Sequence, residues 1–126
     1  MTVAAVRAEG LAYSYGSRRA LDDLTLEIRP REIFSVLGPN GGGKTTLLRI
    51  LSTLAPQHDG TLQIFGEDLP AAMSRVRAMI GVVFQKPSLD GKLTVAENLR
   101  HHGMLYGTSG ARLKDAVTTS LARLGL

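Results

Sequence analysis

The chain contains no cysteine and no tryptophan, and only three tyrosines and three phenylalanines among its 126 residues. Without cysteine, disulfide bonds and thiolate metal sites are excluded, and the composition fits a reducing compartment. No apolar run approaches the roughly 18–20 residues that a membrane-spanning helix needs. The start of the chain, Met1 to Arg7, does not have the pattern of a secretory signal. The length suits about one domain, and we expect it in the cytosol.

Positive charge exceeds negative charge, with a formal net charge of +4. The basic residues occur in scattered pairs, such as Arg18 with Arg19 and Arg75 with Arg77, and acidic residues separate these pairs. Nucleic-acid-binding proteins usually concentrate positive charge on one face and add aromatic side chains for stacking. We therefore do not expect nucleic acid as the main partner and interpret the charges as a solvated surface. A mildly basic face would also suit anionic lipid headgroups.

The N-terminal part of the sequence predicts two strands joined by a turn. Val3 to Tyr13 is the first predicted strand, and Gly16 with Ser17 supplies the turn. From Asp22 to Ile28 apolar and polar residues alternate, as in a strand with one buried face. This part of the chain is expected to be antiparallel.

The middle of the sequence alternates strand and helix patterns. Ile33 to Leu37 and Ile80 to Phe84 are nearly continuous apolar runs, which predict strands covered on both faces. Lys44 to Leu54 predicts a helix, and Thr61 to Gly66 and Ala71 to Ala78 predict a short strand and a short helix. This order favours an α/β fold with a mostly parallel sheet. The first helix offers several side chains for burial: Leu47, Leu48, Ile50, Leu51 and Leu54.

The C-terminal part predicts helices. Thr94 is followed three residues later by Glu97, which is the spacing of a capping box. Gly107 to Gly110 interrupts the helical pattern, and a further helix begins at Ala111 and ends at Gly125. Its apolar stripe is interpreted as core packing: Leu113, Val117, Leu121 and Leu124.

A glycine-rich segment between the first buried run and its helix matches the P-loop pattern G-x-x-x-x-G-K-[ST] in full. A chance match is improbable because the segment follows a predicted buried strand and opens a predicted helix. That order of elements is the one that phosphate binding requires. The segment consists of Gly38, Pro39, Asn40, Gly41, Gly42, Gly43, Lys44 and Thr45.

Each residue type in this segment has a mechanical reason. Glycines let the backbone approach phosphates closely, and successive N–H groups from about Gly41 to Thr46 can line one anion-binding concavity. The N-terminus of the following helix adds its positive dipole. We expect Lys44 to bind the β- and γ-phosphates, Thr45 to ligate Mg²⁺, and Thr46 to contact the α-phosphate side. Nucleotide binding, with ATP as the ligand, is the main functional prediction.

Further motifs resemble the ATP-binding domain of ABC transporters. Tyr15, in Tyr-Ser-Tyr-Gly, resembles the aromatic residue that stacks on adenine in this family, and Gln85, in Val-Phe-Gln, resembles its Q-loop glutamine. The segments Leu93 to Leu99 and Leu105 to Gly107 resemble the start of the family's helical subdomain. Gly42 departs mildly from the family's usual alanine. The resemblance covers essentially the whole chain and is nearest to drug-resistance and ABC-2-type exporters.

The resemblance implies a partial P-loop NTPase core with an N-terminal antiparallel β region (1–32), a core up to the Q-loop (33–92) and the start of a helical subdomain (93–126). It implies Lys44 and Gln85 as catalytic residues, with Gln85 and Thr45 at Mg²⁺. It also implies an ATPase that powers export across a membrane. The implied partners are a transmembrane permease and a second nucleotide-binding domain, at the cytoplasmic face of the membrane.

Several family motifs have no counterpart in this sequence: the signature, the Walker B Asp-Glu, the D-loop and the switch histidine. His58, His101 and His102 precede the position of that histidine, so we interpret them as surface or helix residues. We therefore expect the N-terminal half of an ATPase domain, which binds MgATP without turning it over. Two alternatives stay open: a soluble ABC-superfamily ATPase that acts on ribosomes or nucleic acid, and a non-catalytic nucleotide-binding remnant.

Overall fold

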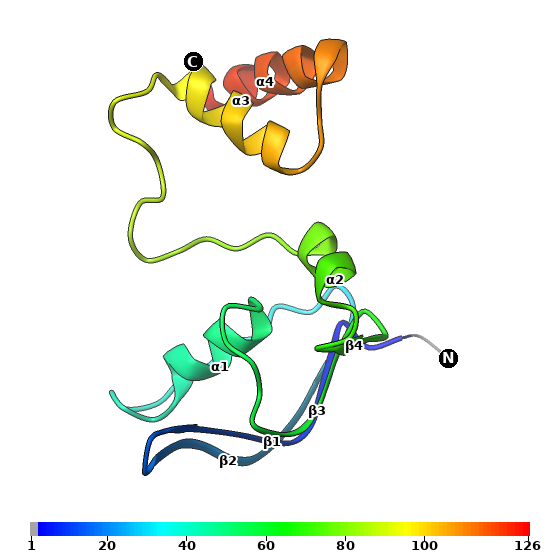
Figure 1. Ribbon diagram of the computed structural model, residues 1–126, viewed down its shortest axis with the longest axis vertical. Coiled ribbons are helices and arrows are strands. Elements are labelled where there is room, and N and C mark those ends of the chain that lie inside the picture. Colours follow the sequence, from blue (N-terminus) through cyan, green and yellow to red (C-terminus); the bar gives the residue numbers. More distant parts are fainter. Residues whose placement is uncertain (1–2) are drawn as a thin grey trace. The chain divides into compact units, whose positions relative to one another are not determined.

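The computed structural model describes residues 3–126 and divides the chain into two compact units at Val82 and Val83. The first unit contains a sheet with helices α1 and α2, and the second contains helices α3 and α4 (Figure 1). This combination of sheet and helices confirms the predicted α/β class.

The sheet has four strands in the order β2-β1-β3-β4, and each neighbouring pair is antiparallel. The predicted antiparallel pair at the N-terminus is confirmed, and Gly16 and Ser17 form its turn. The pair places Tyr15 at the end of β1 opposite Arg18 at the start of β2. The strand bounds are β1 Val6–Tyr15, β2 Arg18–Ile28, β3 Asp59–Ile64 and β4 Glu67–Leu69.

The core of the first unit lies between the sheet and the helices α1 (Lys44–Leu51) and α2 (Met73–Met79). Its largest fully buried side chains come from all of these layers, namely Leu11, Ile50, Leu62 and Val76. Two of the residues predicted for burial, Leu48 and Leu54, are instead 56% and 54% exposed. Leu48 faces solvent from α1, whereas Leu54 lies beyond its end.

Helix α1 ends earlier than predicted because the chain turns sharply after Ser52. Thr53 has a positive φ of 61°, which a continuing helix does not allow. The Arg77 guanidinium of α2 donates to the Thr53 hydroxyl at 2.8 Å and to its carbonyl at 3.1 Å. These bonds fix the end of α1 against α2.

The two apolar runs predicted as buried strands are irregular in the structure, so this prediction is wrong. Ile33 is 96% exposed and Leu37 90% exposed in the first run, and Val83 in the second is 99% exposed. A strand needs a neighbour for its backbone hydrogen bonds, and within residues 3–126 neither run has one. The expected parallel strands are therefore not formed in the described part of the chain.

The second unit pairs helix α3 (Val95–Leu105) with helix α4 (Gly110–Leu124). The predicted capping box is confirmed: the Thr94 hydroxyl accepts from the Glu97 N–H at 3.2 Å, and the Glu97 carboxylate accepts from the Thr94 N–H at 2.8 Å. Gly125 adopts a left-handed conformation and ends α4, as predicted. Leu113 and Val117 are the buried residues of α4.

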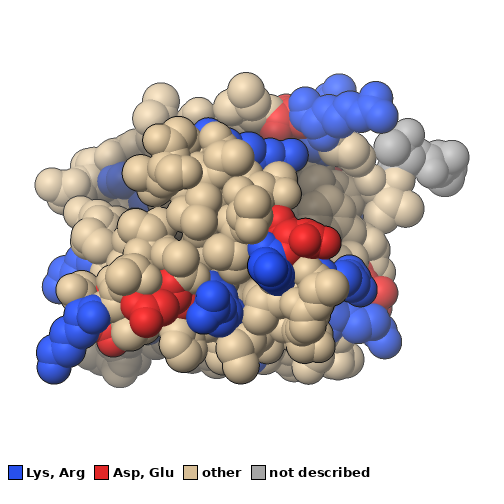
Figure 2. All heavy atoms as spheres, turned by 90° about the horizontal axis from the view of Figure 1, so that it is seen from above, with Lys and Arg blue, Asp and Glu red and all other residues tan. Residues whose placement is uncertain are grey.

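Basic and acidic side chains are interspersed on the face shown in Figure 2. Among the described residues, no helix combines the length and the apolar character needed to span a membrane.

Replacement of Ile50 by alanine tests the core of the first unit. Ile50 is 1% exposed, so Ile50→Ala should lower the free energy of unfolding by about 2–5 kcal/mol. Leu48→Ala on the same helix should change it by only about 0.5 kcal/mol, because Leu48 is 56% exposed. Urea denaturation followed by circular dichroism measures both values. Equal losses for the two variants would contradict the assigned core.

Acid should weaken the N-terminus of α3. Hydrogen bonds from the Thr94 hydroxyl and N–H lower the pKa of Glu97 below its ordinary value of 4.5. Because the folded pKa is the lower one, the carboxylate stabilises the helix above about pH 4.5 and loses this effect as the pH falls through the lowered pKa. Glu97→Gln, which removes the titrating group, should show a shallower loss of helical circular dichroism in acid. Identical acid profiles would refute this role of the carboxylate.

Candidate phosphate-binding site

The N-terminus of α1 is open. Gly43 is the N-cap residue and supplies no side-chain cap, and the first turn contains no acidic residue. The first helical hydrogen bond runs from the Leu47 N–H to the Gly43 carbonyl at 2.8 Å. The N–H groups of the preceding residues have no acceptor within the helix. Together with the helix dipole, they form a site that favours an anion.

Gly43 also fixes the loop against the sheet. Its φ of 83° lies in the left-handed region, and an added Cβ would overlap the Ala20 carbonyl oxygen and lie 2.8 Å from Cδ2 of Leu21. The loop backbone therefore lies directly on β2, and only glycine fits at this point. This contact brings the start of α1 close to the β1–β2 turn.

The Lys44 ammonium lies under the loop that precedes it. Its Nζ donates to the Gly38 carbonyl at 2.7 Å and to the Pro39 carbonyl at 2.6 Å. The Gly42 N–H donates to the same Pro39 carbonyl at 3.2 Å. A lysine ammonium has three N–H donors, so one remains for a ligand. The bonds to the loop keep the charge near the helix N-terminus.

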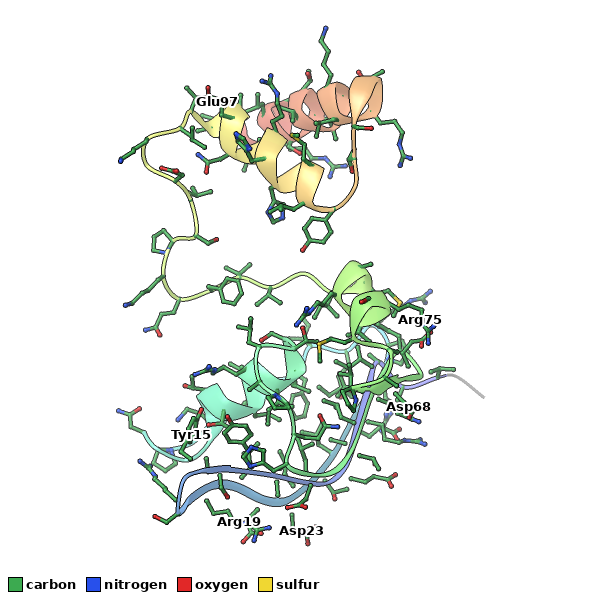
Figure 3. The ribbon with its side chains drawn as sticks, in the orientation of Figure 1. Tyr15, Arg19, Asp23, Asp68, Arg75 and Glu97 are labelled. Atoms are coloured by element: carbon green, nitrogen blue, oxygen red, sulfur yellow. The ribbon has the colours of Figure 1, made fainter. Side chains whose placement is uncertain are left out.

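Tyr15 reaches the start of α1 from the β1–β2 turn, as Figure 3 shows. Its hydroxyl accepts a hydrogen bond from the Thr46 hydroxyl at 3.4 Å, while 46% of the residue stays exposed. An exposed aromatic ring anchored beside a phosphate loop can stack on a base.

A second layer of rings supports Tyr15. Tyr13 meets it edge to face at a centroid distance of 4.9 Å, and His58 stacks on Tyr13 at 4.2 Å. Nδ1 of His58 accepts a hydrogen bond from the Ser14 N–H at 3.1 Å. The sequence interpretation of His58 as an ordinary surface residue missed this contact with the strand that carries Tyr15.

The start of α1, the loop before it and Tyr15 line one open cavity of ≈ 200 Å³. Ligand pockets commonly measure about 300–1,000 Å³, so this cavity suits the phosphate part of a larger ligand. None of its lining residues is acidic, and two are basic, which favours an anionic ligand. The lining residues are Tyr15, Arg18, Ala20, Asn40, Gly41, Gly43, Lys44, Thr45 and Thr46.

Most residues predicted for nucleotide binding thus lie together. Gly38, Pro39 and Gly42 belong to the same loop but shape it through backbone hydrogen bonds instead of lining the cavity. Gln85 lies in the second unit, in an exposed irregular segment. Its predicted role beside Mg²⁺ and the attacking water remains a prediction.

Two lining residues, Arg18 and Ala20, were not predicted from the sequence. Both belong to β2, directly after the turn that Tyr15 enters. For Arg18 a signal was available in the sequence, because a two-residue turn places the residues on either side of it, here Tyr15 and Arg18, opposite each other.

The arrangement can also take part in binding a divalent cation. Thr45 lines the cavity from the first turn of α1 and presents a hydroxyl oxygen. Mg²⁺ is commonly bound through one or two protein ligands and the phosphates of a substrate. Within the described residues, no group of three or more His, Asp or Glu side chains could hold a metal by itself. The donors present therefore fit a metal that arrives with a phosphate ligand.

The sequence matches the family model for "ABC transporter" over residues 21–126. It is 40% identical to the Nod factor export ATP-binding protein I of Paraburkholderia xenovorans, over 93% of this chain and 38% of that protein. It is 38% identical to the daunorubicin/doxorubicin resistance ATP-binding protein DrrA of Streptomyces peucetius, over 97% of this chain and 37% of that protein. The chain thus spans less than half the length of these relatives.

Solved structures give the same result for the fold. The structure titled as an ATP binding subunit of an ABC transporter has a TM-score of 0.74 and 28% identity, over 84% of this chain and 44% of that one. CbiO1 from Clostridium perfringens, described as part of the complex cbiONQ, has a TM-score of 0.81 over 98% of this chain and 51% of that one. At 23% identity, the second likeness concerns the fold alone.

Gly43→Ala should separate the loop from β2. The left-handed backbone costs a residue with a Cβ about 1–2 kcal/mol, and the overlap with Ala20 adds about 1–3 kcal/mol more. Gly16→Ala is the matched control, because Gly16 has a φ of 57° and no atom within 4 Å of an added Cβ. Chemical denaturation should therefore show the larger loss for Gly43→Ala. Equal losses would mean that the contact with β2 does not constrain the loop.

Proposed function

The chain belongs to the ABC transporter family, and from this premise we propose that it binds MgATP as part of an ATPase subunit that powers export across a membrane. ATP binding and hydrolysis by the whole protein would be coupled to movement of the exported substrate. This chain spans only 38% of the Nod factor protein. We therefore propose hydrolysis and transport for the whole protein to which the chain corresponds in part.

One observation carries the proposal: an uncapped helix N-terminus, a lysine ammonium and an exposed tyrosine line a single cavity without an acidic residue. The N–H groups of α1 and the Lys44 ammonium suit the β- and γ-phosphates, because both donate hydrogen bonds and carry partial or full positive charge. Tyr15 suits the adenine ring, since aromatic stacking on a base contributes about 1–3 kcal/mol. These two parts of the cavity match a ligand with an anionic phosphate tail and a flat base.

We assign the metal-binding role to the Thr45 hydroxyl, with phosphate oxygens as the other ligands. Bound Mg²⁺ would neutralise charge that develops on the phosphates. Gln85 would complete this shell and orient the attacking water, and Lys44 would stabilise the transferring phosphoryl group.

The names of the relatives favour an exporter over the alternative of an ATPase that acts on ribosomes or nucleic acid. One relative is named for Nod factor export, and another for daunorubicin/doxorubicin resistance. We therefore propose a transmembrane permease and a second nucleotide-binding domain as partners. The subunit would lie at the cytoplasmic face of the membrane through that permease.

Calorimetric titration of the purified chain with MgATP tests the proposal. Wild type should bind, and Lys44→Ala should bind roughly 10- to 100-fold more weakly, because charge-assisted hydrogen bonds contribute about 1.5–3 kcal/mol. Lys114→Ala, which removes a lysine from α4 in the other unit, is the matched control and should bind as wild type does. Circular dichroism establishes that each sample is folded. A folded wild type that binds no MgATP would refute the proposed function.

A further inference from the structure

Arg18 is a second cation in the cavity, on a different element from Lys44. It is the first residue of β2 and lies opposite Tyr15 across the β1–β2 turn. It lines the same cavity as Lys44, Thr45 and Thr46. The cavity therefore receives positive charge both from the start of α1 and from the sheet.

The guanidinium of Arg18 lies against the phosphate loop. Its Nη2 is 3.2 Å from the position that a Cβ of Gly41 would take. Because Gly41 has no side chain, the guanidinium approaches the loop backbone where the loop turns toward α1. This position is close to the N–H groups expected to hold phosphate.

Arg18 and its neighbour Arg19 have different surroundings. In the described part of the chain, ion pairs are formed by Arg7, Arg19 and Arg75. Arg19 bonds to Asp22 through Nε at 3.0 Å, and Figure 3 shows it on the side of the turn away from α1. Arg18 is not among these ion pairs. Successive side chains of a strand point to opposite faces. Arg19 therefore lies on the outer surface of the sheet, and Arg18 faces the cavity.

We propose that Arg18 is a further nucleotide-binding residue, which donates hydrogen bonds to the phosphate oxygens from the side of β2. A guanidinium keeps its charge at physiological pH and presents a planar fork of donors that matches phosphate oxygens in pairs. Its place between Tyr15 and Gly41 puts this fork where a base on the tyrosine would join phosphates on the loop. The inference rests on the proposed function and extends it to a residue outside the P-loop.

Paired variants separate this role from a general effect of charge. Calorimetry with MgATP, with inorganic triphosphate and with adenosine should be carried out on wild type, Arg18→Ala, Arg18→Lys and Arg19→Ala. Arg18→Ala should weaken binding of MgATP and of triphosphate roughly 10-fold or more, and should leave adenosine binding unchanged. Arg18→Lys keeps the charge without the fork, so its affinity should be intermediate. Arg19→Ala should stay within about twofold of wild type, since its side chain lies outside the cavity.

Each outcome distinguishes this inference from the proposed function. Binding that depends on Lys44 but changes equally little in Arg18→Ala and Arg19→Ala would overturn the role of Arg18 and leave the proposed function intact. An equal loss for adenosine and triphosphate would place Arg18 at the base and overturn the phosphate contact. A folded wild type that binds neither MgATP nor triphosphate would overturn both.

Discussion

The contact between Gly43 and the backbone of β2 is the constraint on which the site depends. It holds the start of α1 against Ala20 and Leu21, so the helix N-terminus meets the sheet at the end of the β1–β2 turn. Tyr15 and Arg18 flank that turn, and the same contact therefore brings them beside the phosphate loop. A side chain at this position would move the loop away from β2 and separate the two halves of the cavity. The Gly43 contact therefore fixes the shape of the cavity more than its charge.

The N-termini of helices α1 and α3 differ in how their free N–H groups are satisfied. Helix α3 satisfies its first N–H groups with Thr94 and Glu97, and the carboxylate adds negative charge beside the helix dipole. Helix α1 has neither a side-chain cap nor an acidic first turn. A glycine N-cap without a side-chain bond makes the helix less stable than a polar cap by roughly a few tenths of a kcal/mol, a cost that a bound anion can offset. A ligand that occupies this end would also stabilise the folded first unit by mass action.

How much the sequence predicts depends on whether a signal is local. The P-loop, the capping box and the end of α4 at Gly125 follow from short patterns, and the structure has the loop, the cap and the helix end at the predicted positions. The runs that contain Ile33 and Val83 have the composition of buried strands, but a strand also needs a hydrogen-bonding neighbour, which composition does not supply. Arg18 and His58 were missed because their significance comes from contacts across the hairpin and between distant segments.

The hydrogen bonds of Lys44 indicate how much each positive group of the site contributes to phosphate affinity. Its ammonium already donates to the carbonyls of Gly38 and Pro39, so one N–H is free for phosphate and any further bond to phosphate replaces an existing one. A phosphate oxygen is the stronger acceptor, because both partners are then charged. The net gain from Lys44 is nevertheless smaller than for a cation without such bonds. The open N–H groups of α1 and the guanidinium of Arg18, outside the ion pairs of the described residues, give up fewer protein bonds when phosphate binds. The affinity of this cavity for phosphate should therefore depend on the helix end and on β2 as much as on the lysine.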